Sequence, residues 1–244
     1  VNADVPAAQP RDLLALLGAM PPGGIAITEA EGGTTNALAL SQAGLFALPT
    51  TINNVETLAS VSHILNRGAE WYKGLCLSNP KSTGTKLISV CGHVQRPGNY
   101  EVTMGTPMKD LIFDMCGGMK PGRTLKAVIP GGSSVPIMTA AETEDCLLDY
   151  EGGVARGSML GSAGMIVMDD STDMVYQIWR LARFYAHESC AQCTQCREGT
   201  AWTTKILERI LAGKGKAADL DLLLSLSENM TGKTICVLSD SCAA

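Results

Sequence analysis

The chain has 244 residues, enough for one large domain or two to three small ones that each bury a core. Hydrophobic residues make up 45% of it and charged residues 18%, which is a globular composition and excludes a disordered chain. The net charge is -5 without any block of basic residues, so nucleic acid is not expected as a partner. No apolar run approaches the roughly 20 residues that a spanning helix needs, so no direct membrane span is expected.

The N-terminal part of the chain predicts little regular structure. Residues 1–48 contain four prolines and six glycines, and we expect an N-terminal arm or linker there. From Pro49 the signals sharpen, because polar residues that can cap a helix are followed by apolar residues at helical spacing up to Gly68. Residues 49–83 are therefore predicted to hold a helix whose N-terminus carries two asparagines.

The periodicity changes over residues 84–170. Residues 85–94 alternate like a strand, and residues 96–102 read as a turn into a second one. A short helix with a proline near its first turn and further buried strands follow. This order predicts a small α+β unit.

After residue 170 the sequence predicts helices. Three segments of residues 171–230 carry apolar residues at helical spacing, with cap residues or glycines at several of their ends. The last residues have room only for the beginning of a fourth helix. The predicted fold class is therefore α+β, with a helical bundle over residues 171–244.

Nine cysteines, an odd and unevenly spread number, favour metal ligation in a reducing compartment over a disulfide scaffold. Cys190, Cys193 and Cys196 follow one another at three-residue intervals. Zinc more often uses two pairs of cysteines, and no second pair of this spacing occurs. Three such cysteines with a remote fourth are the arrangement of a [4Fe-4S] cluster, and Cys236 and Cys242 are both candidates for the fourth ligand. The alternative without a metal is that these cysteines are incidental buried thiols, since free cysteine behaves as a small hydrophobic residue.

The segment "ESCAQCTQCREGT", with Cys236 forty residues after Cys196, resembles the cluster motif of the NADH-binding flavoprotein subunits of respiratory complex I. Related diaphorase subunits of NAD-linked hydrogenases and formate dehydrogenases carry a similar motif. "LPTTINNVETLASV", "GTKLISVCGHVQRPGNYEV" and "GSMLGSAGMIVMD" are similar to successive landmarks of the same subunits. The resemblance covers roughly residues 45–244 and concerns the C-terminal part of these subunits only.

This resemblance implies a fold and site residues. Residues 49–83 are expected to be the helical remnant of an FMN-binding domain, residues 84–170 a ubiquitin-like β-grasp domain of the soluble ligand-binding type, and residues 171–244 a [4Fe-4S]-binding helical bundle. The cluster ligands carry over to Cys190, Cys193, Cys196 and Cys236, and the flavin contacts to Ile52, Asn53, Asn54 and Thr57. Without the resemblance, Asn53 and Asn54 read as ordinary helix caps.

The resemblance also implies a function. In these subunits a hydride passes from NADH to FMN, and electrons then pass singly through the [4Fe-4S] cluster towards quinone. The chain is thus expected to belong to the NADH dehydrogenase module of complex I, an NADH:ubiquinone oxidoreductase. The Rossmann-like half that binds FMN and NADH should precede Pro49, where only 48 residues without a glycine-rich phosphate loop stand. The flavin site is therefore expected to be shared with another chain or a missing segment, and the isolated chain to be inactive with NADH.

The implied partners are a chain carrying the Rossmann-like half if the subunit is split, a thioredoxin-like [2Fe-2S] subunit and the large iron-sulfur subunit. The implied location is peripheral, on the matrix side of the mitochondrial inner membrane or the cytoplasmic face of a bacterial membrane. Two alternatives stay open, namely a diaphorase subunit of an NAD-linked hydrogenase or formate dehydrogenase, and a non-redox, metal-stapled assembly module.

Two residues near the cysteines raise further expectations. The positive charge of Arg197 is expected to lie near the reduced cluster, the alternative being a solvated surface arginine. Ala191 stands where relatives usually carry glycine, a change that tightens the loop if this position needs a positive φ.

Overall fold

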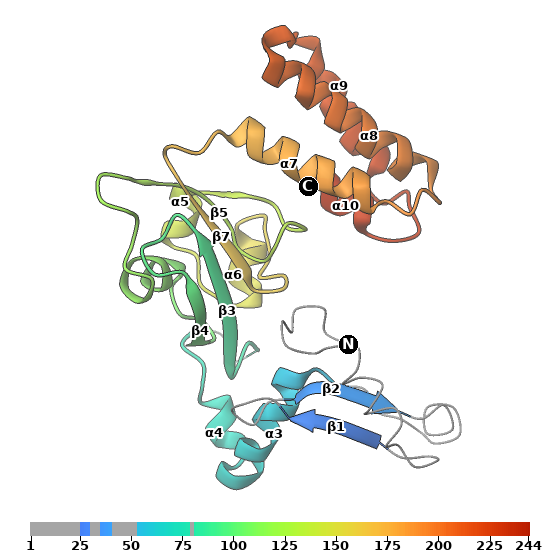
Figure 1. Cartoon of the computed structure of the whole chain (residues 1–244). Helices are drawn as coiled ribbons and strands as arrows, with labels where there is room; N and C mark the ends of the chain where they lie inside the picture. The colour runs from blue at the N-terminus through green and yellow to red at the C-terminus, as the bar shows by residue number, and fades with distance from the viewer. Residues whose placement is uncertain (1–24, 30–34, 41–52, 79–80) are drawn as a thin grey trace. The chain divides into compact units, whose positions relative to one another are not determined.

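The computed structural model describes residues 25–29, 35–40, 53–78 and 81–244 (Figure 1). The chain divides into two compact units, residues 1–69 and residues 70–244. The first unit contains the strands β1 (Ile25–Glu29) and β2 (Thr35–Leu40) and the helix α3 (Val55–Arg67). A short helix, α4 (Ala69–Lys73), begins where the first unit ends.

Strands β1 and β2 pair antiparallel, which the sequence analysis did not predict. The expectation of little regular structure is therefore wrong for these two stretches. Both contain β-branched residues, among them Ile25, Ile27 and Thr35, whose side chains favour extended backbone. The proline and glycine content of the surrounding sequence outweighed this local preference in the prediction.

Helix α3 has both of the end signals that its sequence predicted. Asn54 is the N-cap residue, in extended conformation, and its side-chain oxygen accepts a hydrogen bond of 2.8 Å from the backbone N–H of Glu56. At the other end Gly68 adopts a φ of 89°, and its N–H donates to the carbonyl oxygen of Ile64. The predicted helix is confirmed.

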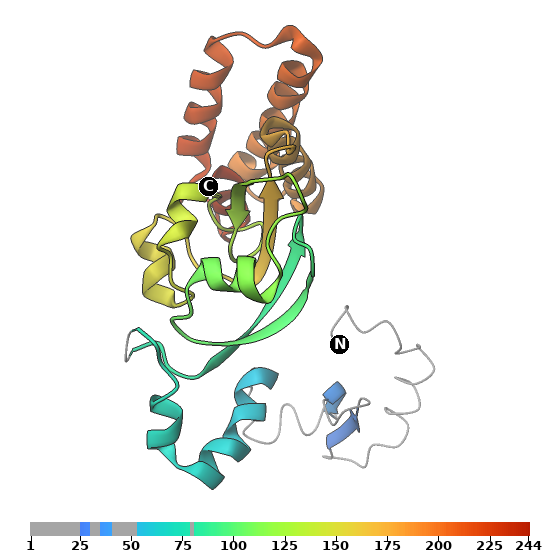
Figure 2. The same cartoon turned by 90° about the vertical axis from the view of Figure 1, so that its left-hand side faces the viewer.

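The second unit contains a mixed five-stranded sheet of order β4-β3-β7-β5-β6 (Figures 1 and 2). Its strands are β3 (Thr85–Gly92), β4 (Gly98–Thr103), β5 (Leu125–Ile129), β6 (Met138–Thr139) and β7 (Gly164–Asp169). Strands β3 and β7 run parallel, and the other neighbouring strands run antiparallel. The three short helices of this part are η1 (Asp110–Met115), α5 (Ala140–Glu144) and α6 (Tyr150–Ala155).

Both faces of the sheet are used for packing, because alternate residues of a strand point to opposite faces. On one face Ile88 and Val167 belong to the main buried cluster together with Leu111 of η1. The other face contributes Ala127 and Met168 to a second cluster, against which Met174 and Leu181 of the following helix pack. The helix that contains Met174 and Leu181 thus packs against the second face of the sheet.

The C-terminal part of the second unit is helical and is coloured orange to red in Figure 1. Its elements are α7 (Met174–Glu188), α8 (Thr194–Arg209), η2 (Ile210–Lys214), α9 (Ala218–Met230) and α10 (Leu238–Ala243). The three predicted helices and the start of a fourth are confirmed, and so is the α+β class. In the part of the chain that the structure describes, no helix is long and apolar enough to cross a bilayer.

An ion pair fixes the turn between α8 and α9. Asp219, near the start of α9, is buried, and its carboxylate accepts hydrogen bonds from the guanidinium of Arg209 and from the backbone N–H of Lys216. These contacts, that of Arg209 foremost, lower the pKa of the Asp219 carboxyl. The turn lets α9 run back along α8, so that the chain returns towards the beginning of α8.

Candidate metal centre

The three closely spaced cysteines lie on the loop between α7 and α8 and on the first turn of α8. Cys193 is the N-cap residue of α8, in extended conformation, and Cys196 lies within the first turn. Cys190 is exposed and Cys193 partly exposed, whereas Cys196 is buried with 7% exposure. Two of the three thiols thus lie at the positive end of a helix dipole, where a thiolate is stabilised.

The loop turns sharply at Ala191, between the first two cysteines. Ala191 has a φ of 64°, in the left-handed region that costs a non-glycine residue about 1 kcal/mol. The position therefore does need a positive φ. This is the condition under which alanine in place of glycine is expected to tighten the loop. The guanidinium of Arg197 supports this conformation, because its Nη1 donates a hydrogen bond of 2.8 Å to the carbonyl oxygen of Ala191.

A second segment of the chain meets the cysteine loop at Cys193. The backbone N–H of Ile235 donates to Cys193 Sγ over 3.4 Å, across 42 residues of sequence. The next residue is Cys236, which is exposed. Its backbone is held locally, since the hydroxyl of Thr234 donates to the carbonyl oxygen of Cys236 over 2.8 Å. The structure thus brings the segment of Cys236 to the cysteine loop.

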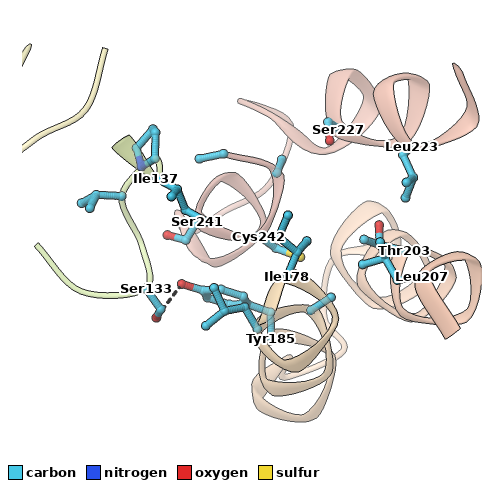
Figure 3. Close-up of a pocket in the computed structure, with 16 residues that line it drawn as sticks. Ser133, Ile137, Ile178, Tyr185, Thr203, Leu207, Leu223, Ser227, Ser241 and Cys242 are labelled. Carbon is cyan, nitrogen blue, oxygen red and sulfur yellow. Dashed lines mark hydrogen bonds between the residues drawn. The ribbon is translucent and has the colours of Figure 1, made fainter. Parts of the chain in front are cut away.

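Cys242, the other candidate for the fourth ligand, lines an apolar cavity of about 360 Å³ (Figure 3). Helices α7 to α10 and the loop of residues 133–137 enclose it, with Ile178 and Leu207 in its wall. Burial, and to a smaller extent the charge of nearby Cys196, raise the pKa of the Cys242 thiol to about 11. Cys242 is therefore a neutral thiol at pH 7 in apolar surroundings.

The donors of this region suit an iron-sulfur cluster. All of them are thiols, the backbone N–H of Ile235 donates to the sulfur of Cys193, and the hydroxyl of Ser189 lies within hydrogen-bond distance of the sulfur of Cys196. Among the described residues, no group of three or more His, Cys, Asp or Glu side chains is arranged to hold a single metal ion.

Sequence reasoning missed one residue of this region, Ser189. It directly precedes Cys190 and is the C-cap residue of α7. Its Oγ lies 3.3 Å from Cys196 Sγ and accepts a hydrogen bond of 3.3 Å from the backbone N–H of Ala191. A serine beside a cysteine has no signal of its own in the sequence, because the contact depends on how the loop folds.

The predicted flavin contacts belong to the other unit. Asn53, Asn54 and Thr57 are exposed at the start of α3, and Ile52 lies outside the described residues. Asn54 is a helix cap in the structure, as its sequence predicts when the family resemblance is left aside. Asn53 and Thr57 leave a flavin role open, because both are exposed.

Comparison with known proteins relates both parts of the second unit to described families. Residues 176–244 match the family described as the NADH-ubiquinone oxidoreductase-F iron-sulfur binding region, and residues 86–176 match the SLBB domain. The F subunit of NADH-quinone oxidoreductase from Rickettsia bellii is 47% identical over 201 residues, which are 82% of this chain and 48% of that protein. One of the F subunits of the same enzyme from Rhizobium meliloti is 48% identical over the same share of this chain and 46% of its own length.

The resemblance to the C-terminal part of these NADH-binding flavoprotein subunits is confirmed. The chain spans about half the length of the curated relatives that it matches. A solved structure, that of an NAD+-reducing [NiFe]-hydrogenase in the air-oxidised state, is similar with a TM-score of 0.69 and 34% identity. That likeness covers 80% of this chain and 32% of the hydrogenase chain.

Proposed function

We propose that this chain is an electron-relay part of the NADH dehydrogenase module of complex I, and that Cys190, Cys193, Cys196 and Cys236 bind a [4Fe-4S] cluster in it. The hydrogen bond from Ile235 to Cys193 carries the proposal, because it holds the residue before Cys236 against the cysteine loop. The family match of residues 176–244 to an iron-sulfur binding region supports it.

When bound, the cluster accepts and releases one electron at a time. The chain's own residues bind it and stabilise its charge. The N-terminus of α8 directs its dipole at the sulfurs of Cys193 and Cys196 and offsets their negative charge. The burial of Cys196 keeps water from one side of the site.

The electrons are proposed to come from FMN that NADH has reduced. Ile52, Asn53, Asn54 and Thr57 contribute one wall of the flavin site, and the FMN- and NADH-binding half lies on another chain or on a segment outside this sequence. The N-terminus of α3 suits an anionic phosphate, which supports this assignment.

On the basis of the family resemblance, the proposed partners are a thioredoxin-like [2Fe-2S] subunit and the large iron-sulfur subunit. The chain itself is proposed to be a peripheral subunit, on the matrix side of the mitochondrial inner membrane or the cytoplasmic face of a bacterial one.

Residues 84–170 are proposed to form a β-grasp domain followed by the cluster-binding bundle. The mixed sheet with β3 and β7 parallel at its centre supports this, and so does the match of residues 86–176 to the SLBB domain.

The second candidate function is the diaphorase part of an NAD-linked hydrogenase, favoured by the likeness to the hydrogenase structure. The higher identity to the NADH-quinone oxidoreductase relative, 47% against 34%, makes it the weaker candidate.

Serine substitution tests the ligand set. In the full chain purified without oxygen, iron content and the EPR signal of the reduced cluster are measured for Cys190→Ser, Cys193→Ser, Cys196→Ser and Cys236→Ser. Each is expected to lose most of its iron and to unfold more easily, because metal binding and folding are coupled. Cys242→Ser and the exposed Cys91→Ser are the controls and should keep both. Iron lost from Cys242→Ser but kept by Cys236→Ser would exclude Cys236 as the fourth ligand.

A further inference from the structure

Among the hydrogen bonds of the described loop residues 189–197, the contact between Ser189 Oγ and Cys196 Sγ is the one that joins another side chain to a cysteine sulfur. Its Oγ lies 3.3 Å from Sγ of Cys196, a distance within the reach of a hydrogen bond to sulfur. The serine is held from two sides. Its backbone N–H donates to the carbonyl oxygen of Tyr185 over 3.0 Å at the end of α7, and its Oγ accepts from the backbone N–H of Ala191 over 3.3 Å.

The direction of the contact with Cys196 follows from the chemistry of the two groups. The backbone N–H of Ala191 can only donate, so it uses a lone pair of Ser189 Oγ and leaves the hydroxyl hydrogen free. A cysteine that is a metal ligand is a thiolate and has no hydrogen of its own. The hydroxyl of Ser189 must then be the donor and Cys196 Sγ the acceptor.

We propose that Ser189 tunes the reduction potential of the cluster by donating a hydrogen bond to the ligand sulfur of Cys196. This inference rests on the proposed function, since it requires Cys196 to be a cluster ligand. Reduction adds negative charge to the cluster and its sulfurs, so a donor to sulfur stabilises the reduced state more than the oxidised one. Cys196 is 7% exposed, so little water is available to replace the lost donor.

The test compares substitutions that differ only in the hydroxyl. Ser189→Thr keeps the hydroxyl, and Ser189→Val removes it with a side chain of the same shape as threonine. The extended backbone of residue 189, with φ of -60° and ψ of 124°, accepts both β-branched residues. In the full chain, an EPR-monitored redox titration gives the potential, and iron analysis gives the cluster content. Ser189→Val and Ser189→Ala are expected to keep iron and to lower the equilibrium constant for reduction up to about tenfold, which for one electron is about 59 mV. Ser189→Thr should stay close to the wild-type potential.

Ser225→Ala removes an exposed hydroxyl from α9 and is the matched control, with an expected potential equal to that of the wild type. Equal potentials for Ser189→Thr and Ser189→Val would overturn the inference while leaving the cluster in place. Loss of iron from Ser189→Val but not from Ser189→Thr would overturn it as well, since the hydroxyl would then only support the ligand loop. An iron-free wild-type chain would instead contradict the proposed function itself.

Discussion

The guanidinium of Arg197 bridges the cysteine loop, with Nη1 2.8 Å from the carbonyl oxygen of Ala191. Its Nε also lies 3.0 Å from the carboxylate of Glu198. Arg197 is thus neither a freely solvated surface arginine nor an isolated positive charge. It lies beside the candidate ligands and is paired with a negative charge that partly offsets its own.

The first prediction follows from this pair. Arg197→Met is expected to lower the reduction potential of the cluster, because it removes a positive charge that favours the reduced state, and Glu198→Gln is expected to raise it. Both side chains are more than 40% exposed, so solvent screens them and the shifts should be modest and shrink in high salt. Redox titration of the full chain measures both.

Arg197→Lys is the control, since it keeps the charge but not the geometry of the guanidinium. Its potential should stay nearer to the wild-type value than that of Arg197→Met. Shifts of the same sign in Arg197→Met and Glu198→Gln would contradict the electrostatic explanation.

The second prediction concerns the strained alanine of the loop. Ala191 has a φ of 64°, so Ala191→Gly is expected to raise the free energy of unfolding by up to about 1 kcal/mol. Ala201→Gly, in the middle of α8, is the opposite case and should lower it by about 1 kcal/mol. Urea unfolding of the full chain gives both values, and destabilisation by Ala191→Gly would contradict the observed loop conformation.

The sequence predicted the secondary structure where local rules decide it. Helix α3 was predictable at both ends, since a polar cap and a glycine mark them. The pairing of β1 with β2 was missed because their strand preference lies among proline and glycine signals. The cysteine loop was found by its spacing alone.

The contacts within the candidate site were not predictable, because they join residues distant in sequence or depend on loop geometry. The hydrogen bond from Ile235 to Cys193 requires the α8–α9 hairpin to return the chain. The contact of Ser189 with Cys196 requires the left-handed turn at Ala191. The ligand assignment and the flavin contacts stay predictions.

The third prediction is a pH dependence at the turn between α8 and α9. The pKa of buried Asp219 is lowered, mainly by its hydrogen bond with Arg209, from the 3.8 of an unperturbed aspartate. The ionised carboxylate therefore stabilises the fold fully above that pH, and this stabilisation is lost as the pH falls below 3.8 through the folded-state pKa.

Asp219→Asn is thus expected to destabilise the chain at pH 7, and the difference from the wild type should shrink below pH 4. Unfolding curves of the two proteins at each pH give this difference in the free energy of unfolding. The cysteines contribute equally to the stability of both proteins, so their contribution cancels in the difference. Asp221→Asn, at an exposed position of the same helix, is the control and should have a small effect. A difference between Asp219→Asn and the wild type that is constant from pH 7 to pH 3 would exclude the ion pair as its cause.

The last prediction separates the two roles of Asn54, helix cap and flavin contact. Asn54→Ala removes the acceptor for the N–H of Glu56 and should destabilise α3 by about 1 kcal/mol. Asp is as good a cap as Asn, so Asn54→Asp should keep the helix. It places a negative charge at the proposed phosphate site, however, and is expected to weaken flavin retention by repulsion. Asn53→Ala, which leaves the cap in place, should also weaken flavin retention and leave iron content unchanged.

These variants are compared in the assembled complex, with FMN content measured by fluorescence after release, and helix content measured in the full chain by circular dichroism. Flavin retention that follows helix content, lost in Asn54→Ala and kept in Asn54→Asp, would mean that Asn54 only caps α3. A lower FMN content in Asn54→Asp, at wild-type helix content, would establish the contact with the phosphate. The discrimination works because the cap needs only an acceptor oxygen, which both side chains have, whereas an anionic ligand also responds to the charge.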